Sequence, residues 1–67
     1  MHNKLDVQIH HAGSVVMFTP MSSTARAWVE EQATIESWQW LGDAFAVDPR
    51  YADELAAAMQ ADGLSIA

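Results

Sequence analysis

The stretch Val47-Asp48-Pro49-Arg50-Tyr51 turns the chain from an extended segment into a helix. Asp48 suits the N-cap position, because its carboxylate accepts hydrogen bonds from the free backbone N–H groups of the first helical turn. Pro49 suits the first helical position, where no backbone N–H is needed. The stretch therefore predicts that a strand ends before Asp48 and that a helix begins at Pro49.

The predicted helix also carries a signal for its C-terminal end. Gly63 is expected to adopt the positive φ of the residue after the C-cap, which brings Leu64 back onto Met59 in a Schellman motif. Arg50 and Glu54 stand four positions apart, so we expect them to pair on the exposed side of the helix. The apolar stripe that faces the core should consist of Tyr51, Leu55, Ala58 and Met59.

Before this helix, two apolar segments at 38–41 and 44–47 flank Gly42-Asp43, a dipeptide that suits a two-residue hairpin loop. In the register that this loop sets, Trp40 faces Phe45 and Trp38 faces Val47. A chain of 67 residues needs large apolar groups to close a core without disulfides or metal. Six aromatic rings are expected to fill it: Phe18, Trp28, Trp38, Trp40, Phe45 and Tyr51.

The N-terminal part predicts another hairpin. Apolar and polar residues alternate there with the period of two that is typical of a half-buried strand. If Ala12-Gly13 form the loop, Ile9 faces Val16 and Val7 faces Phe18, which places the apolar residues of both strands on one face.

A helix follows this hairpin and completes the pattern. It is expected from about Ser23 to Gln32, with Ser22 or Ser23 as its cap. The resulting order is ββαββα, which predicts a single α+β domain over 1–67 with an antiparallel sheet of about four strands and both helices on one face. Residues 1–4 are expected to fray, and the alternation at 64–66 allows a short edge strand at the C-terminus.

Composition limits the classes of partner. Nine Asp and Glu face three Lys and Arg, a formal net charge of −6 that repels nucleic acid and anionic membranes and favours a basic protein surface. Alternatively, the only role of this charge is to keep a small apolar domain soluble. The chain has no cysteine, which excludes disulfides and thiolate zinc sites, and it has no apolar run of the ~20 residues that span a bilayer. We therefore expect a cytoplasmic location.

No motif in the sequence indicates catalysis. His10 and His11 are neighbours on a predicted strand, so their side chains point to opposite faces and do not share a metal ion. The serines stand in no nucleophile elbow, and the isolated glycines form no phosphate-binding loop. We expect no enzymatic activity, no metal and no cofactor.

Two surfaces are candidates for binding. The first is a set of carboxylates that could imitate the phosphates of a nucleic acid: Glu30, Glu31, Glu36, Asp43, Asp53 and Glu54. The second is the sheet face that the helices leave uncovered, an apolar patch for a partner or a second copy: Val15, Met17, Leu41, Ala44 and Ala46.

Several short motifs resemble those of small proteins found in bacteria, phages and prophages, and the resemblance spans nearly the whole chain. It rests on His10-His11 before Gly13-Ser14, Thr19-Pro20 with Ala25-Arg26 and Trp28, Trp38-Gln39-Trp40 before Gly42, Val47-Asp48-Pro49-Arg50-Tyr51, and Ala61-Asp62-Gly63-Leu64. The resemblance implies a mobile-element ancestry and no catalytic role.

In size, acidity and lack of catalytic motifs, the chain is also similar in type to anti-CRISPR proteins, with no shared motif. The leading hypothesis is therefore an acidic inhibitor, a nucleic-acid mimic that occupies the basic surface of a CRISPR effector or another nucleic-acid-binding protein. The alternative is a homodimeric or accessory interaction module that uses the uncovered sheet face.

Overall fold

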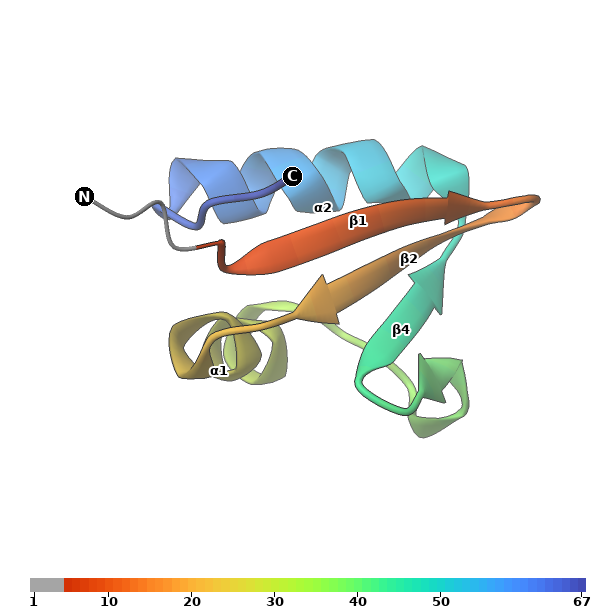
Figure 1. Ribbon diagram of the computed structural model, residues 1–67, viewed down its shortest axis with the longest axis horizontal. Coiled ribbons are helices and arrows are strands. Elements are labelled where there is room, and N and C mark those ends of the chain that lie inside the picture. The colour runs from red at the N-terminus through yellow and green to blue at the C-terminus, as the bar shows by residue number, and fades with distance from the viewer. Residues whose placement is uncertain (1–4) are drawn as a thin grey trace.

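The computed structural model describes residues 5–67, so the expected fraying of residues 1–4 lies outside the described part. The predicted α+β class and the ββαββα order are confirmed, with one short 3-10 helix added before the second hairpin. Figure 1 shows the arrangement of the elements, which are β1 (Val7–Ala12), β2 (Val15–Pro20), α1 (Ser23–Gln32), the 3-10 helix η1 (Ser37–Gln39), β3 (Trp40–Leu41), β4 (Ala44–Val47) and α2 (Pro49–Ala61).

The four strands form one antiparallel sheet in the order β1-β2-β4-β3. The chain crosses through α1 to the far edge, β3, and β4 then returns to pair with β2. Four residues that face the helices are neighbours across the four strands: Ile9, Phe18, Phe45 and Trp40. Phe18 stacks on Phe45 with ring centroids 5.5 Å apart, and Trp40 meets Phe45 edge-on at 5.1 Å.

Both helices cover the same face of the sheet. The buried side chains of α1 and α2 join those of β1, β2 and β4 in a single core cluster, and every strand residue in it belongs to that face. In Figure 1, α2 runs along β1 while α1 lies at the end of β2. The opposite face has no helix over it. Neither helix is long and apolar enough to cross a bilayer, among residues 5–67.

The register of the first hairpin differs from the prediction by two residues. The loop consists of Gly13 and Ser14, so Ile9 pairs with Phe18 rather than with Val16. Gly13 takes φ +67°, which suits the first position of a two-residue hairpin loop. Because side chains alternate with a period of two, a shift of two residues leaves the same residues on the buried face.

The second hairpin is shorter than predicted. Its loop at Gly42-Asp43 and the pairing of Trp40 with Phe45 are confirmed, but Trp38 lies in η1 and does not face Val47. The side chain of Gln39 explains the difference, since its Oε1 accepts the Glu36 N–H at 2.8 Å and its Nε2 donates to the Ala46 carbonyl at 2.9 Å. These bonds hold a helical turn where a strand would otherwise begin.

The expected core of six aromatic rings is therefore wrong in part. Phe18 and Phe45 are fully buried, Trp28 and Trp40 are half-buried, and Trp38 and Tyr51 are exposed. On α2 the buried stripe contains Ala52 with Leu55 and Met59, while the predicted members Tyr51 and Ala58 face solvent. The rest of the core is aliphatic: Val7, Val16, Ala25, Val29, Val47 and Leu64.

Both ends of α2 are confirmed. The Asp48 carboxylate accepts the Arg50 N–H at 2.8 Å, and Gly63 takes φ +92° after the helix. The N–H groups of Gly63 and Leu64 donate to the carbonyls of Gln60 and Met59, as in a Schellman motif. The predicted pairing of Arg50 with Glu54 is wrong, because the Arg50 Nε lies 3.3 Å from the Asp48 carboxylate instead.

The chain after α2 lies along the free edge of β1. Ile66 forms a parallel bridge with Val7, so the expected edge strand is reduced to a single bridge. The Asp6 carboxylate anchors this segment, since it accepts the Ser65 N–H at 2.9 Å and the Ser22 hydroxyl at 2.7 Å. Ser22 in turn caps α1 by accepting the Ala25 N–H at 3.0 Å. One carboxylate therefore joins the C-terminal segment to the start of α1.

Candidate functional site

The predicted acidic residues are all exposed, and they come from four parts of the fold. Two lie on α1, one caps η1, one lies in the loop between β3 and β4, and two lie on α2. The one ion pair found in residues 5–67 joins Arg50 to Asp48, so none of the six forms an ion pair with a cation of the described chain. In that order along the chain they are Glu30, Glu31, Glu36, Asp43, Asp53 and Glu54.

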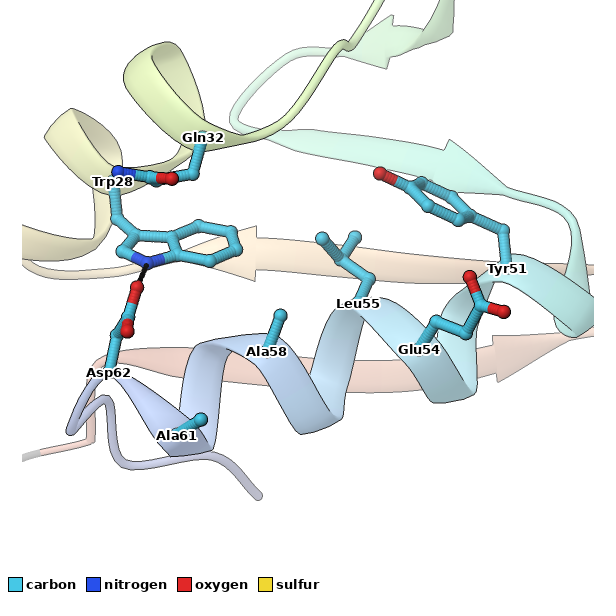
Figure 2. A pocket seen from close by; sticks show the side chains of 8 residues that line it. All are labelled: Trp28, Gln32, Tyr51, Glu54, Leu55, Ala58, Ala61 and Asp62. Carbon is cyan, nitrogen blue, oxygen red and sulfur yellow. Dashed lines mark hydrogen bonds between the residues drawn. The ribbon is translucent and has the colours of Figure 1, made fainter.

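A groove of about 370 Å³ runs between the two helices on the outer side of the molecule. Figure 2 shows its two aromatic side chains, Trp28 from α1 and Tyr51 from α2, at opposite ends, with Leu55 between them. The other lining residues are Gln32, Glu54, Ala58, Ala61 and Asp62. Because Ala58 and Ala61 are small, the facing sides of the helices leave this space unfilled.

Each aromatic ring of the groove has a carboxylate beside it. The Trp28 Nε1 donates to the Asp62 carboxylate at 2.6 Å, which ties α1 to the end of α2. At the other end, Glu54 lies on the turn of α2 next to Tyr51 and its carboxylate is directed toward the same side of the helix (Figure 2). The groove thus combines an apolar floor, two ring faces and two negative charges.

The structure brings only some of the predicted acids together. Trp28 and Asp62 line both this groove and a second depression of about 490 Å³, so the two depressions adjoin. Glu54 lines only the first and Glu31 only the second. We call the two adjoining depressions together the acidic groove. Glu30 and Asp43 line a smaller hollow of about 220 Å³ with Trp40, and there Arg26 offsets part of their charge. Glu36 and Asp53 line neither place.

Sequence reasoning assigned Trp28 and Tyr51 to the core and did not identify the groove. The signal for it was the run of alanines on α2, since Ala58 and Ala61 fall on the side where larger residues would have closed the gap to α1. The contact of Asp62 with Trp28 was likewise not predicted, although the position of Asp62 beside the Gly63 cap directs it back toward α1.

The second predicted surface is one continuous face. Met17 pairs with Ala46 and Leu41 with Ala44, so these side chains point away from the helices by strand alternation. Leu41 is 65 % exposed. We call the whole surface the open sheet face, and it consists of Gln8, His10, Ala12, Val15, Met17, Thr19, Leu41, Ala44 and Ala46.

The Asp48 carboxylate has a structural role at the start of α2. Asp48 accepts the backbone N–H of Arg50 and is also contacted by its guanidinium, and both interactions lower the pKa of the Asp48 carboxyl from its ordinary value. This carboxylate is engaged in capping α2. Within residues 5–67, no three histidine or acidic side chains converge in a way that could hold a metal ion.

Comparison of the chain with protein-family models, with curated proteins and with solved structures finds no significant match.

Proposed function

We propose that the chain is a non-enzymatic binding protein that uses the acidic groove to occupy a basic surface of a nucleic-acid-handling protein. The observation that supports this proposal is that three carboxylates line two adjoining depressions, with Glu54 and Tyr51 in the first, Glu31 in the second, and Asp62 and Trp28 in both. No cation of the described chain forms an ion pair with these carboxylates, and Asp62 accepts one hydrogen bond, from Trp28.

A lysine or arginine side chain of the partner suits this groove. Its aliphatic stem would lie over Leu55 and Ala58, and its charged end would meet Glu54 or Asp62. A cation over the face of a tryptophan or tyrosine ring gains roughly 0.5–2 kcal/mol from the ring quadrupole. The groove therefore favours a cationic side chain over an apolar one of the same length.

The net charge of −6 adds long-range attraction to this local fit. A negatively charged protein approaches a nucleic-acid-binding surface faster than a neutral one does, and salt suppresses the effect. The resemblance to short phage and prophage proteins favours an inhibitor of mobile-element origin, with a CRISPR effector as the partner. Such a protein would compete with the nucleic acid for the basic channel of the effector.

The test is inhibition of DNA cleavage by a panel of purified CRISPR effector–guide complexes. We expect the wild-type chain to inhibit at least one of them and to lose affinity as salt increases. A triple variant, Glu31→Gln, Glu54→Gln and Asp62→Asn, should weaken that binding by roughly 3- to 150-fold, from three exposed charge pairs of about 0.2–1 kcal/mol each.

A matched control variant distinguishes the effect of the acidic groove on binding from the effect of net charge. The triple variant Glu30→Gln, Glu36→Gln and Asp53→Asn removes the same amount of charge from exposed positions outside the acidic groove. It should retain most of the affinity. Equal losses in the two variants would contradict the groove as the binding site, and failure of the wild type to bind any effector would contradict that partner. Circular dichroism checks that each variant is folded.

A further inference from the structure

The open sheet face differs from the rest of the surface in its charge. The chain contains nine acidic and three basic residues, yet none of them is among the nine residues of this face. Its polar members are Gln8, His10 and Thr19, and the others are apolar. The exposed carboxylates lie on the helices, in the β3–β4 loop and at the ends of elements.

An exposed aromatic ring extends the apolar part of this face. Trp38 is 78 % exposed, the highest value among the large hydrophobic side chains that are exposed in the described chain. It lines a depression of about 450 Å³ together with Val15 and Ala46, which both belong to the open sheet face, and with Asp48 and Tyr51 at the start of α2. Tryptophan is among the residue types that are enriched at the hot spots of protein–protein interfaces.

We propose that two copies of the chain form a dimer by packing their open sheet faces against each other. Two copies that each carry −6 repel one another in most orientations. In this orientation the helices of each copy lie on the outside, and the facing sheets are about 10 Å apart. The carboxylates on the two helical layers are then separated by more than the Debye length of about 8 Å.

The chemistry of the face favours a second copy over a basic partner. A basic surface gains no ion pair from a face without carboxylates, and it is attracted to the helical side instead. A second copy presents the same uncharged, apolar surface, so neither side buries a charge on association. Aligned packing of two antiparallel sheets is a common arrangement, and a two-fold axis makes the contact self-complementary.

The area of the open sheet face determines the affinity that we expect for the dimer. Four strands of two to six residues present roughly 300 Å² of flat area per copy, at about 3.3 Å per residue and 4.8 Å between strands. Because side chains project from the plane of the sheet, and because Trp38 adds its ring, the accessible area exceeds this value. The interface is therefore smaller than a standard specific interface, and we expect a weak, transient dimer with a dissociation constant of about 1–100 µM.

The test is sedimentation equilibrium of the purified chain from about 1 µM to about 300 µM, a range that brackets this constant. The wild type should change from monomer to dimer across it. Met17→Glu and Leu41→Glu should each raise the dissociation constant at least tenfold, because each places two carboxylates in the apolar contact. Ala57→Glu adds the same charge at an exposed position of α2 and should leave the constant unchanged within about threefold.

A second measurement locates the interface without depending on any variant. Amide chemical shifts of the wild type, followed over the same concentrations, should change at residues of the open sheet face and at Trp38 and remain constant on α2 after its first turn. A monomer at all concentrations would overturn the proposal, as would a dimer whose shift changes map to the helices or one that both glutamate variants leave intact. The experiment uses no basic partner, so its failure is distinguishable from failure of the proposed function.

Discussion

Two aspartates at the ends of α2 show how position assigns different roles to one residue type. Asp48 precedes Pro49 and accepts the Arg50 N–H, so its carboxylate is engaged in starting the helix. Asp62 follows the last turn and accepts the Trp28 Nε1 at 2.6 Å, so its carboxylate joins two helices and borders the acidic groove. Only Asp48 was predictable in its role, because N-capping depends on neighbours in sequence.

At this scale we predict a pH dependence for Asp48→Asn. The backbone hydrogen bond from Arg50, followed by its side chain, lowers the pKa of the Asp48 carboxyl below its ordinary value of 3.8. The Asp48 carboxyl therefore binds a proton less readily in the folded state than in the unfolded state. The stability that its charge contributes is complete at pH values above the pKa of the unfolded state. This stability is lost as the pH falls through the pKa of the folded state. The variant should melt below the wild type at pH 7, and the difference should shrink as the pH falls below 3.8 and through the lowered pKa of the folded state.

Thermal unfolding by circular dichroism at several pH values measures this difference. Asparagine is the appropriate replacement, because it also caps helices but carries no charge. A difference in melting temperature that stays constant over the whole range would contradict the assigned role of the charge.

At the scale of elements, local signals decided where each segment begins and ends, and side-chain contacts decided the exceptions. The bounds of α1, the start of α2 and the loop at Gly42-Asp43 all agree with the sequence prediction. The strand expected from Trp38 was replaced by η1, because the Gln39 side chain bonds to backbone groups of Glu36 and Ala46. Ala46 belongs to the partner strand, so this exception requires a contact that local sequence does not encode.

The C-terminal cap of α2 predicts a measurable effect for Gly63→Ala. Gly63 adopts φ +92°, which an L-residue with a Cβ reaches at a cost of roughly 1–2 kcal/mol. Nothing lies near the added Cβ, so the loss comes from the backbone alone. Urea unfolding should show a free energy of unfolding lower by about this amount.

Gly63→Asn is the matched control for that substitution. Asparagine tolerates positive φ better than alanine does, so the asparagine variant should be the more stable of the two. The reverse order would indicate that the loss does not arise from the backbone conformation of the cap.

At the scale of the whole molecule, contacts between distant segments hold the layers together. The Asp6 carboxylate joins the start of β1 to Ser22 at the N-cap of α1 and to Ser65, which is 59 positions away in sequence. Ile66 extends the same contact along the edge of β1. The free edge of β1 is thereby partly covered, which limits pairing with other chains at that edge.

We predict that Asp6→Ala lowers the free energy of unfolding by about 1–3 kcal/mol, since hydrogen bonds to a charged group are lost at two sites. Asp6→Asn should lose less, because its side-chain oxygen still accepts one of the two hydrogen bonds. Urea unfolding measures both changes. Faster amide hydrogen exchange at Ser65 in Asp6→Ala would locate the effect, and unchanged exchange there would contradict it.

By itself, the sequence determined the class of fold, the order of the strands and the two long helices, the faces of the strand residues other than those expected at Trp38 and Gln39, and the caps of α2. These features follow from residue period and from contacts within a few positions, such as Asp48 with Arg50 and Gly63 with Gln60. The two-residue error in the first hairpin left the faces intact, because strand side chains repeat with a period of two.

Only the tertiary structure decided the order β1-β2-β4-β3, the exposure of Trp38 and Tyr51, and the placement of Glu31, Glu54 and Asp62 on two adjoining depressions. The position of these carboxylates depends on how α1 and α2 lie against each other and against the sheet. That placement is set by packing between residues far apart in the chain, where the volume of Ala58 matters as much as the hydrophobicity of Leu55. The periodicity and the capping signals of the sequence carry no information on packing between residues so far apart in the chain.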